Sequence, residues 1–120
     1  MGSANHIRQT TLEVRRLSAA EAEVWVMAAV DAVTPATELR GKVTGPRCPG
    51  VTTIELAYPL RPVPTPASAA ANTLVARVII PEPNLWTQAT PFLYEGRLEL
   101  WQDGGCCDTA TVAVGLAQAR

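Results

Sequence analysis

The chain has 120 residues, the size of one domain, and its 48% hydrophobic against 18% charged residues exclude an intrinsically disordered chain. Ten Lys and Arg against eleven Asp and Glu give a formal charge of −1 without a basic stripe. Nucleic acid and membranes are therefore not expected as partners. No apolar run is long enough to span a membrane. No signal peptide is visible, which leaves the compartment open.

Short runs with a period of two follow one another along the chain, separated by Gly, Pro and Asn. Each run predicts a strand, because successive side chains of a strand point to opposite faces. The runs are 11–17, 23–33, 38–44, 51–60, 73–80, 93–102 and 109–116. They predict an all-β fold, a seven-stranded, immunoglobulin-like two-sheet sandwich. The domain is expected over 11–117, and residues 1–10 are interpreted as a flexible N-terminus or tag remnant.

One segment also carries helical signals. Ser18 and Glu21 form a capping-box pattern, and the alanine-rich stretch 20–33 follows. The β-branched valines of this stretch and its period of two favour a strand. A strand is therefore predicted, with a helix over 20–33 as the alternative.

Two further segments are interpreted as connections. The stretch 61–72 contains alternate prolines that lack the amide donor a central strand needs, which predicts a surface loop. Asp103-Gly104-Gly105 predicts a tight hairpin, so the last two strands should pair antiparallel.

The most informative segment is 80–94, where Leu85-Trp86 is followed by Pro91-Phe92-Leu93-Tyr94. It resembles the signature of the immunoglobulin-like β-sandwich domain of family-two glycoside hydrolases, the β-galactosidase and β-glucuronidase group. The resemblance covers 78–116, although Leu116 stands where that family usually has an aromatic residue. It implies that the two catalytic glutamates lie in a barrel that follows this domain, so no residue here corresponds to them.

Two aromatic residues of this segment have expected roles. Trp86 is predicted to plug the open end of the sandwich, with a sugar-stacking platform as the rival interpretation. Tyr94, at the start of a strand, is suited to a tyrosine corner, in which the hydroxyl bonds to upstream backbone. Together with Leu85, Pro91 and Leu93, they form the expected structural motif.

No catalytic, cofactor or metal site is expected. Cys48, Cys106, Cys107 and the single His6 provide neither a closed zinc site nor an oriented Cys–His nucleophile. Cys48 should lie at the opposite end of the sandwich from the other two cysteines, which excludes a disulfide between them. The carboxylates, Glu95 and Glu99 among them, are expected on solvated strand faces instead of across a cleft.

An outward apolar patch is predicted on two strands. If Val24 and Val26 face the core, their neighbours on the strand face outward, and the same holds beside Arg77 on the strand over 73–80. These strands are neighbours in an immunoglobulin-type sheet. The predicted partner surface is Trp25, Met27, Val75, Arg77 and Ile79. The alternative is that the loop 61–72 covers it.

The predicted function is a non-catalytic accessory or linker sandwich of a glycoside hydrolase-like protein. It would act by packing on a neighbouring domain of a larger chain or on another copy. One alternative is a carbohydrate-binding module, with exposed Trp25 or Trp101 as the stacking platform. Trp101 has Glu99 and Gln102 nearby to bond a sugar, whereas Trp25 has mainly Ala and Met. Another alternative is a free-standing adhesion or assembly domain.

Overall fold

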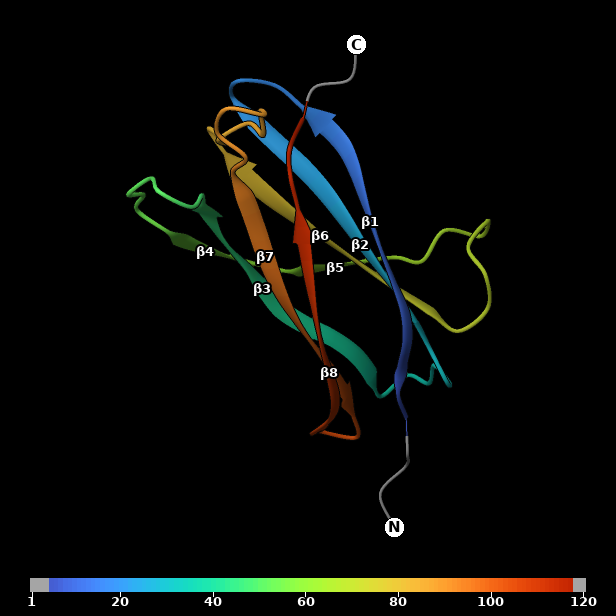
Figure 1. Cartoon of the computed structure of the whole chain (residues 1–120). Helices are drawn as coiled ribbons and strands as arrows, with labels where there is room; N and C mark the ends of the chain where they lie inside the picture. Colours follow the sequence, from blue (N-terminus) through green and yellow to red (C-terminus); the bar gives the residue numbers. More distant parts are fainter. Residues whose placement is uncertain (1–4, 118–120) are drawn as a thin grey trace.

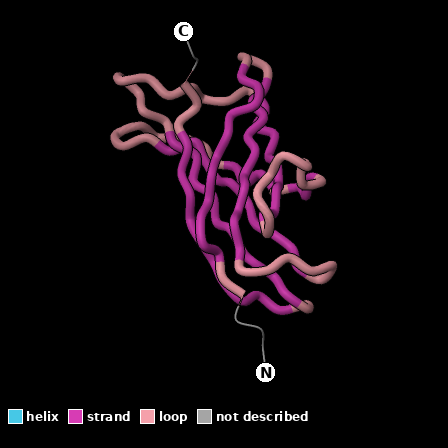
Figure 2. Tube along the Cα trace, turned by 90° about the vertical axis from the view of Figure 1, so that its right-hand side faces the viewer, coloured by secondary structure: helices cyan, strands magenta, loops and turns pink. Residues whose placement is uncertain are grey.

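The computed structural model describes residues 5–117, which form eight strands in two antiparallel sheets (Figure 1). The first sheet has the order β1 (Ile7–Leu17), β2 (Glu21–Val30), β6 (Thr73–Pro81), β5 (Arg61–Val63). The second sheet has the order β4 (Leu56–Pro59), β3 (Thr37–Arg47), β7 (Leu93–Gln102), β8 (Gly105–Val114). No described residue is helical (Figure 2). The all-β sandwich is confirmed.

The number of strands differs from the expected seven because the run 51–60 is not one strand. Only β4 forms there, and the chain then crosses to the first sheet, where β5 pairs with the edge of β6. Leu60 lies at the crossing and donates its N–H to the carbonyl of Gly41 at 3.0 Å. Pro62 is tolerated in β5 because an edge strand can leave one amide position without a donor.

The segment with helical signals is a strand, as its β-branched residues predicted. Ser18 does not cap a helix but closes the turn between β1 and β2. Its hydroxyl accepts the N–H groups of Ala20 and Glu21, each at 3.2 Å. Its own N–H donates to the carbonyl of Glu21 at 2.9 Å. Ser, Thr and Asp side chains bind local backbone donors both in turns and at helix starts, so the pattern does not distinguish the two.

The N-terminal boundary needs correction, because β1 begins at Ile7 and not at residue 11. Asn5 is buried, and its side-chain amide donates to the carbonyl of Ala32 at 2.8 Å. The N–H of Ile7 donates to the carboxylate of Asp108 at 2.8 Å. Residues 5–10 therefore belong to the sandwich. Of the expected flexible N-terminus or tag remnant over 1–10, residues 1–4 lie outside the described residues.

The core lies between the sheets and consists of two clusters of buried side chains. β2 contributes to both, since its alternate residues from Ala22 to Val30 are all buried. The first cluster is Ala22, Val24, Val43, Val78, Ile80, Tyr94 and Leu116, and the second is Val26, Ala28, Val30, Leu39, Ala76, Leu98 and Leu100. Burying each large apolar side chain contributes about 1.5–3 kcal/mol.

The predicted hairpin joins β7 and β8. Asp103 and Gly104 both have positive φ angles, 53° and 82°, as a two-residue type I′ turn requires. The turn lies at the lower end of the sandwich in Figure 1, and β8 ends at the opposite end. That opposite end, which also carries the loops 18–20, 48–55 and 82–92, is called the exit end below.

Candidate interaction surfaces

Tyr94 anchors the segment 82–92 to the core. Its side chain is fully buried, and its hydroxyl accepts the N–H of Asn84 at 2.9 Å. This is the arrangement expected of a tyrosine corner. Burial raises the pKa of the Tyr94 hydroxyl above its ordinary value.

Trp86 is not the buried plug that was expected, because 38% of its surface is exposed. Its backbone N–H donates to the carbonyl of Leu116 at 2.9 Å, and its indole ring covers Gly115. A Cβ atom at Gly115 would lie 2.7 Å from Cδ1 of Trp86, so only glycine fits beneath the ring. Leu116 and Tyr94 fill this end of the core instead. The other motif residues, Leu85, Pro91 and Leu93, surround Tyr94 and Trp86: Leu85 packs on the core, Pro91 pairs with Trp86, and Leu93 is exposed.

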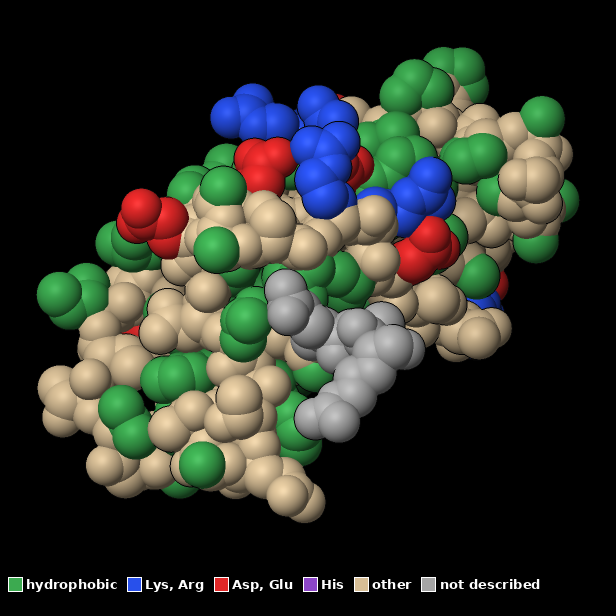
Figure 3. All heavy atoms as spheres, turned by 90° about the horizontal axis from the view of Figure 1, so that it is seen from above, with side chains coloured by type: hydrophobic (Ala, Val, Ile, Leu, Met, Phe, Trp, Pro, Cys, Tyr) green, Lys and Arg blue, Asp and Glu red, His purple; other side chains and the backbone are tan. Residues whose placement is uncertain are grey.

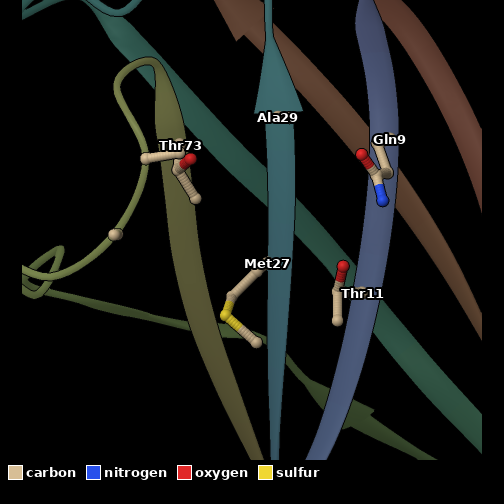
Figure 4. A pocket seen from close by; sticks show the side chains of 7 residues that line it. Gln9, Thr11, Met27, Ala29 and Thr73 are labelled. Atoms are coloured by element: carbon tan, nitrogen blue, oxygen red, sulfur yellow. The ribbon is translucent and has the colours of Figure 1, made fainter.

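The predicted patch on the first sheet is assembled by strand pairing but is partly covered. Trp25 lies opposite Arg77, and Met27 opposite Val75, on β2 and β6. Val75 is nevertheless buried, and Met27 and Ile79 are half-buried. Met27 points into a hollow of about 230 Å³ that the loop residues Ala69 and Ala70 help to line, with Gln9, Thr11, Ala29 and Thr73 (Figure 4). The loop thus covers part of the patch, which was the alternative interpretation.

Each sheet carries the same arrangement of Trp, Arg and Glu on its outer face. On the first sheet, Trp25 donates its indole N–H to Glu23 at 2.7 Å, and the Arg15 guanidinium lies 4.1 Å over the ring. On the second sheet, Trp101 donates to Glu99 at 3.2 Å, beneath the guanidinium of Arg40 at 4.1 Å. Both indoles therefore have one face covered and their donor engaged.

The acidic and sulfur-containing groups do not converge. Among residues 5–117, no three His, Cys, Asp or Glu side chains lie close enough to hold a metal ion. Cys48 follows β3 at the exit end, whereas Cys106 and Cys107 follow the β7–β8 turn at the opposite end (Figure 1). The described segments also include no helix long and apolar enough to cross a membrane.

The exit end carries apolar side chains that the sequence interpretation placed on a strand. Ile54 is 85% exposed and Leu56 is 55% exposed. The β-branched residues of 51–55 have the composition of a strand, although this segment belongs to neither sheet in the structure. The available signal was Pro49-Gly50, a turn dipeptide immediately before this segment.

Solved structures of longer enzymes share this fold. The chain is similar to a Bifidobacterium dentium β-glucuronidase complexed with coumarin-3-O-glucuronide, with 17% identity, a TM-score of 0.63, and coverage of 95% of this chain and 18% of that chain. A β-glycosidase from Bacteroides vulgatus has 14% identity and a TM-score of 0.60, and the match covers 94% of this chain and 13% of that chain. A glycosyl hydrolase family 2 member from Bacteroides cellulosilyticus DSM 14838 has 19% identity and a TM-score of 0.59, and the match covers 94% of this chain and 15% of that chain.

The chain thus spans less than a fifth of each of these enzymes. No curated protein matches it significantly. The family model of glycosyl hydrolases family 2 matches residues 5–116, which is nearly the whole chain. The resemblance carried by Leu85-Trp86 and Pro91-Phe92-Leu93-Tyr94 is confirmed, and the chain belongs to glycosyl hydrolases family 2.

Proposed function

We propose that this chain is a non-catalytic accessory or linker sandwich of a glycoside hydrolase, which acts by packing on a neighbouring domain or on another copy. The observation that supports it best is how its carboxylates are used. Glycoside hydrolysis needs two carboxyl groups that face each other across the scissile bond. Here several carboxylates lie at the surface in ion pairs with arginines, namely Glu13 with Arg15, Glu21 with Arg16, Glu38 with Arg40, and Glu55 and Glu95 with Arg47.

Family membership supports a role within a larger assembly. The solved relatives are at least five times longer than the part that this chain matches, since it covers at most 18% of them. The chain would therefore supply one sandwich of a multidomain enzyme. Its partners are proposed to be protein surfaces.

The outer face of the first sheet is one proposed contact surface. Arg77 is exposed there and Trp25 and Ile79 are half-buried, whereas Val75 is buried. Arg77 also approaches Glu23 at 4.0 Å, so the face has an aromatic centre and a charged rim. Such a composition is typical of protein interfaces.

The carbohydrate-binding alternative has less support. A stacking platform needs a free indole face and free hydrogen-bonding groups around it. Arg40 covers one face of Trp101, and Glu99 accepts its N–H. Gln102 is occupied as well, because its amide contacts Thr37, Thr34 and Asn5. The adhesion alternative has no feature of its own in its favour.

Two assays on the purified chain test the proposal. With aryl β-glycosides we expect no turnover, and turnover that disappears in Glu95→Gln or Glu99→Gln would contradict a non-catalytic role. With oligosaccharides we expect no change in indole fluorescence. A saturable change that Trp101→Ala removes would favour the carbohydrate-binding alternative.

A further inference from the structure

The four edge strands of the two sheets are not equally protected against pairing with another chain. An edge strand presents unpaired backbone N–H and C=O groups, which proteins usually block by a short strand, a proline or charged side chains. β4 and β5 have four and three residues, and they contain Pro59 and Pro62. β1 is long but carries several charged side chains, namely Arg8, Glu13, Arg15 and Arg16. β8 has ten residues, no proline and a single charged residue, Asp108, so it lacks these protections.

The stretch 109–114 of β8 is regular and uncharged. The bulge in the β7–β8 ladder lies before it, where Cys107 has no partner on β7. From Thr109 to Val114, each residue lies opposite one residue of β7. The N–H of Ile7 joins β1 to β8 at Asp108, and no further hydrogen bond joins these two strands among residues 5–117. The other edge of 109–114 is therefore free to pair.

The apolar inner face of the sandwich continues onto β8 and β1, where it is incompletely covered. On the second sheet, Leu98 of β7 is buried, whereas its partner on β8, Ala110, is half-buried. On the first sheet, Val24 of β2 is buried, whereas its partner on β1, Val14, is 38% exposed. β1 and β8 lie on the same side of the sandwich (Figure 1). A strand added to β8 would extend the second sheet and cover this side further.

We propose that the free edge of β8 pairs antiparallel with β8 of a second copy of this chain, so that two four-stranded sheets become one continuous sheet. This inference rests on the proposed packing function and names its surface and partner. A register centred on Thr111 places Ala110 opposite Val112 of the second copy, so that inward side chains meet inward side chains and no like charges meet within 109–113. A second copy fits better than an unstructured peptide, because its β8 is already ordered and loses little further conformational entropy on pairing.

Electrostatic repulsion between two copies is small. The formal net charge is only −1, and a net charge near zero favours association. Seen from the exit end, acidic and basic side chains lie together mainly on one side of the molecule (Figure 3). The uncharged stretch 109–114 therefore has no strong repulsion to overcome.

Sedimentation of residues 1–120 at several concentrations tests the proposal, together with hydrogen–deuterium exchange at the same concentrations. We expect a dimer whose formation increases the protection of amides within 109–114. Thr111→Lys should raise the dissociation constant at least about tenfold, because two lysines would face each other across the new ladder. Ala113→Lys is a second exposed substitution on the same edge and should weaken the dimer too. Thr11→Lys is the matched control, since Thr11 is an exposed threonine on the other long edge strand, β1. Urea midpoints show whether each variant is folded.

The outcomes separate this inference from the function on which it rests. A monomer at every concentration would overturn the inference and leave packing on a neighbouring domain as the function. A dimer that Thr11→Lys weakens, but Thr111→Lys and Ala113→Lys do not, would overturn the inference and leave packing on another copy. If the amides of 109–114 gain protection only in a longer polypeptide, the edge pairs with a neighbouring domain and the inference is wrong. Glycoside turnover by the chain would instead overturn the proposed function, whatever its state of association.

Discussion

Gly115 and Trp86 show how a single residue without a side chain organises the exit end. The indole ring of Trp86 packs on Gly115, and the backbone N–H of Trp86 donates to the carbonyl of Leu116. The ring therefore covers backbone and does not fill the core. Removing it should cost less than removing a buried tryptophan, for which about 3–5 kcal/mol is usual.

We expect Trp86→Ala to lower the free energy of unfolding by less than about 3 kcal/mol. Gly115→Ala should destabilise the domain by about 1–3 kcal/mol, because the methyl group forces the ring away. Urea denaturation of both variants measures this. If Trp86→Ala lowers the free energy of unfolding by more than about 3 kcal/mol, Trp86 acts as a core plug after all.

Tyr94→Phe isolates the hydroxyl that accepts the Asn84 N–H. The ring stays buried while the amide loses its acceptor, so we expect a loss of about 1–3 kcal/mol in unfolding free energy. Tyr58→Phe is the control, since Tyr58 packs against the same cluster from a half-buried position. Equal midpoints for the two variants in urea would contradict the corner.

At the scale of elements, β1 is held at its start by acidic groups. The Asp108 carboxylate accepts the N–H groups of Ile7 and Thr109, and these bonds hold its pKa below the ordinary value. Hydrogen bonding to Arg8 likewise lowers the pKa of Asp31, which also contacts His6. A carboxyl group with a lowered pKa in the folded state binds fewer protons than in the unfolded chain.

The stabilisation from Asp108 is therefore fully present above about pH 4, the ordinary Asp pKa, and is lost as the pH falls through its lower folded-state pKa. We expect the protection factors of the amides of 7–10, which correct for the slower intrinsic exchange in acid, to fall in that acid range. Asp108→Asn should weaken this start at neutral pH and reduce its acid dependence. If the protection of the amides of 7–10 depends on pH in the same way in Asp108→Asn and in the wild type, Asp108 does not hold the start of β1.

Periodicity predicted the long strands because each has one buried face, as β2 shows with alternate residues from Ala22 to Val30. It could not predict the crossing at Leu60, since the bond to Gly41 joins segments far apart in sequence. It also could not show that Ile54 lacks a partner, because an alternating β-branched run looks the same with or without a facing sheet. The loop over Met27 was likewise a matter of tertiary packing.

At the scale of the whole molecule, the positions of the three cysteines test the order of the strands. Cys48 lies at the exit end and the other two at the opposite end, so an intrachain bridge between them would need another strand order. Thiol titration of the denatured, unreduced protein should count all three cysteines of the sequence. A count of one would contradict the strand order or indicate a bond between Cys106 and Cys107.

The chain enters the sandwich at one end and leaves it at the other, along the longest dimension of 49 Å (Figure 1). Tension between whatever adjoins residue 5 and whatever adjoins residue 117 would therefore act parallel to β1 and β8. The ladder that joins β1 to β2 would be loaded in shear, so its hydrogen bonds would resist together instead of opening one after another. The load at which the sandwich fails would then be set by its rate of unfolding.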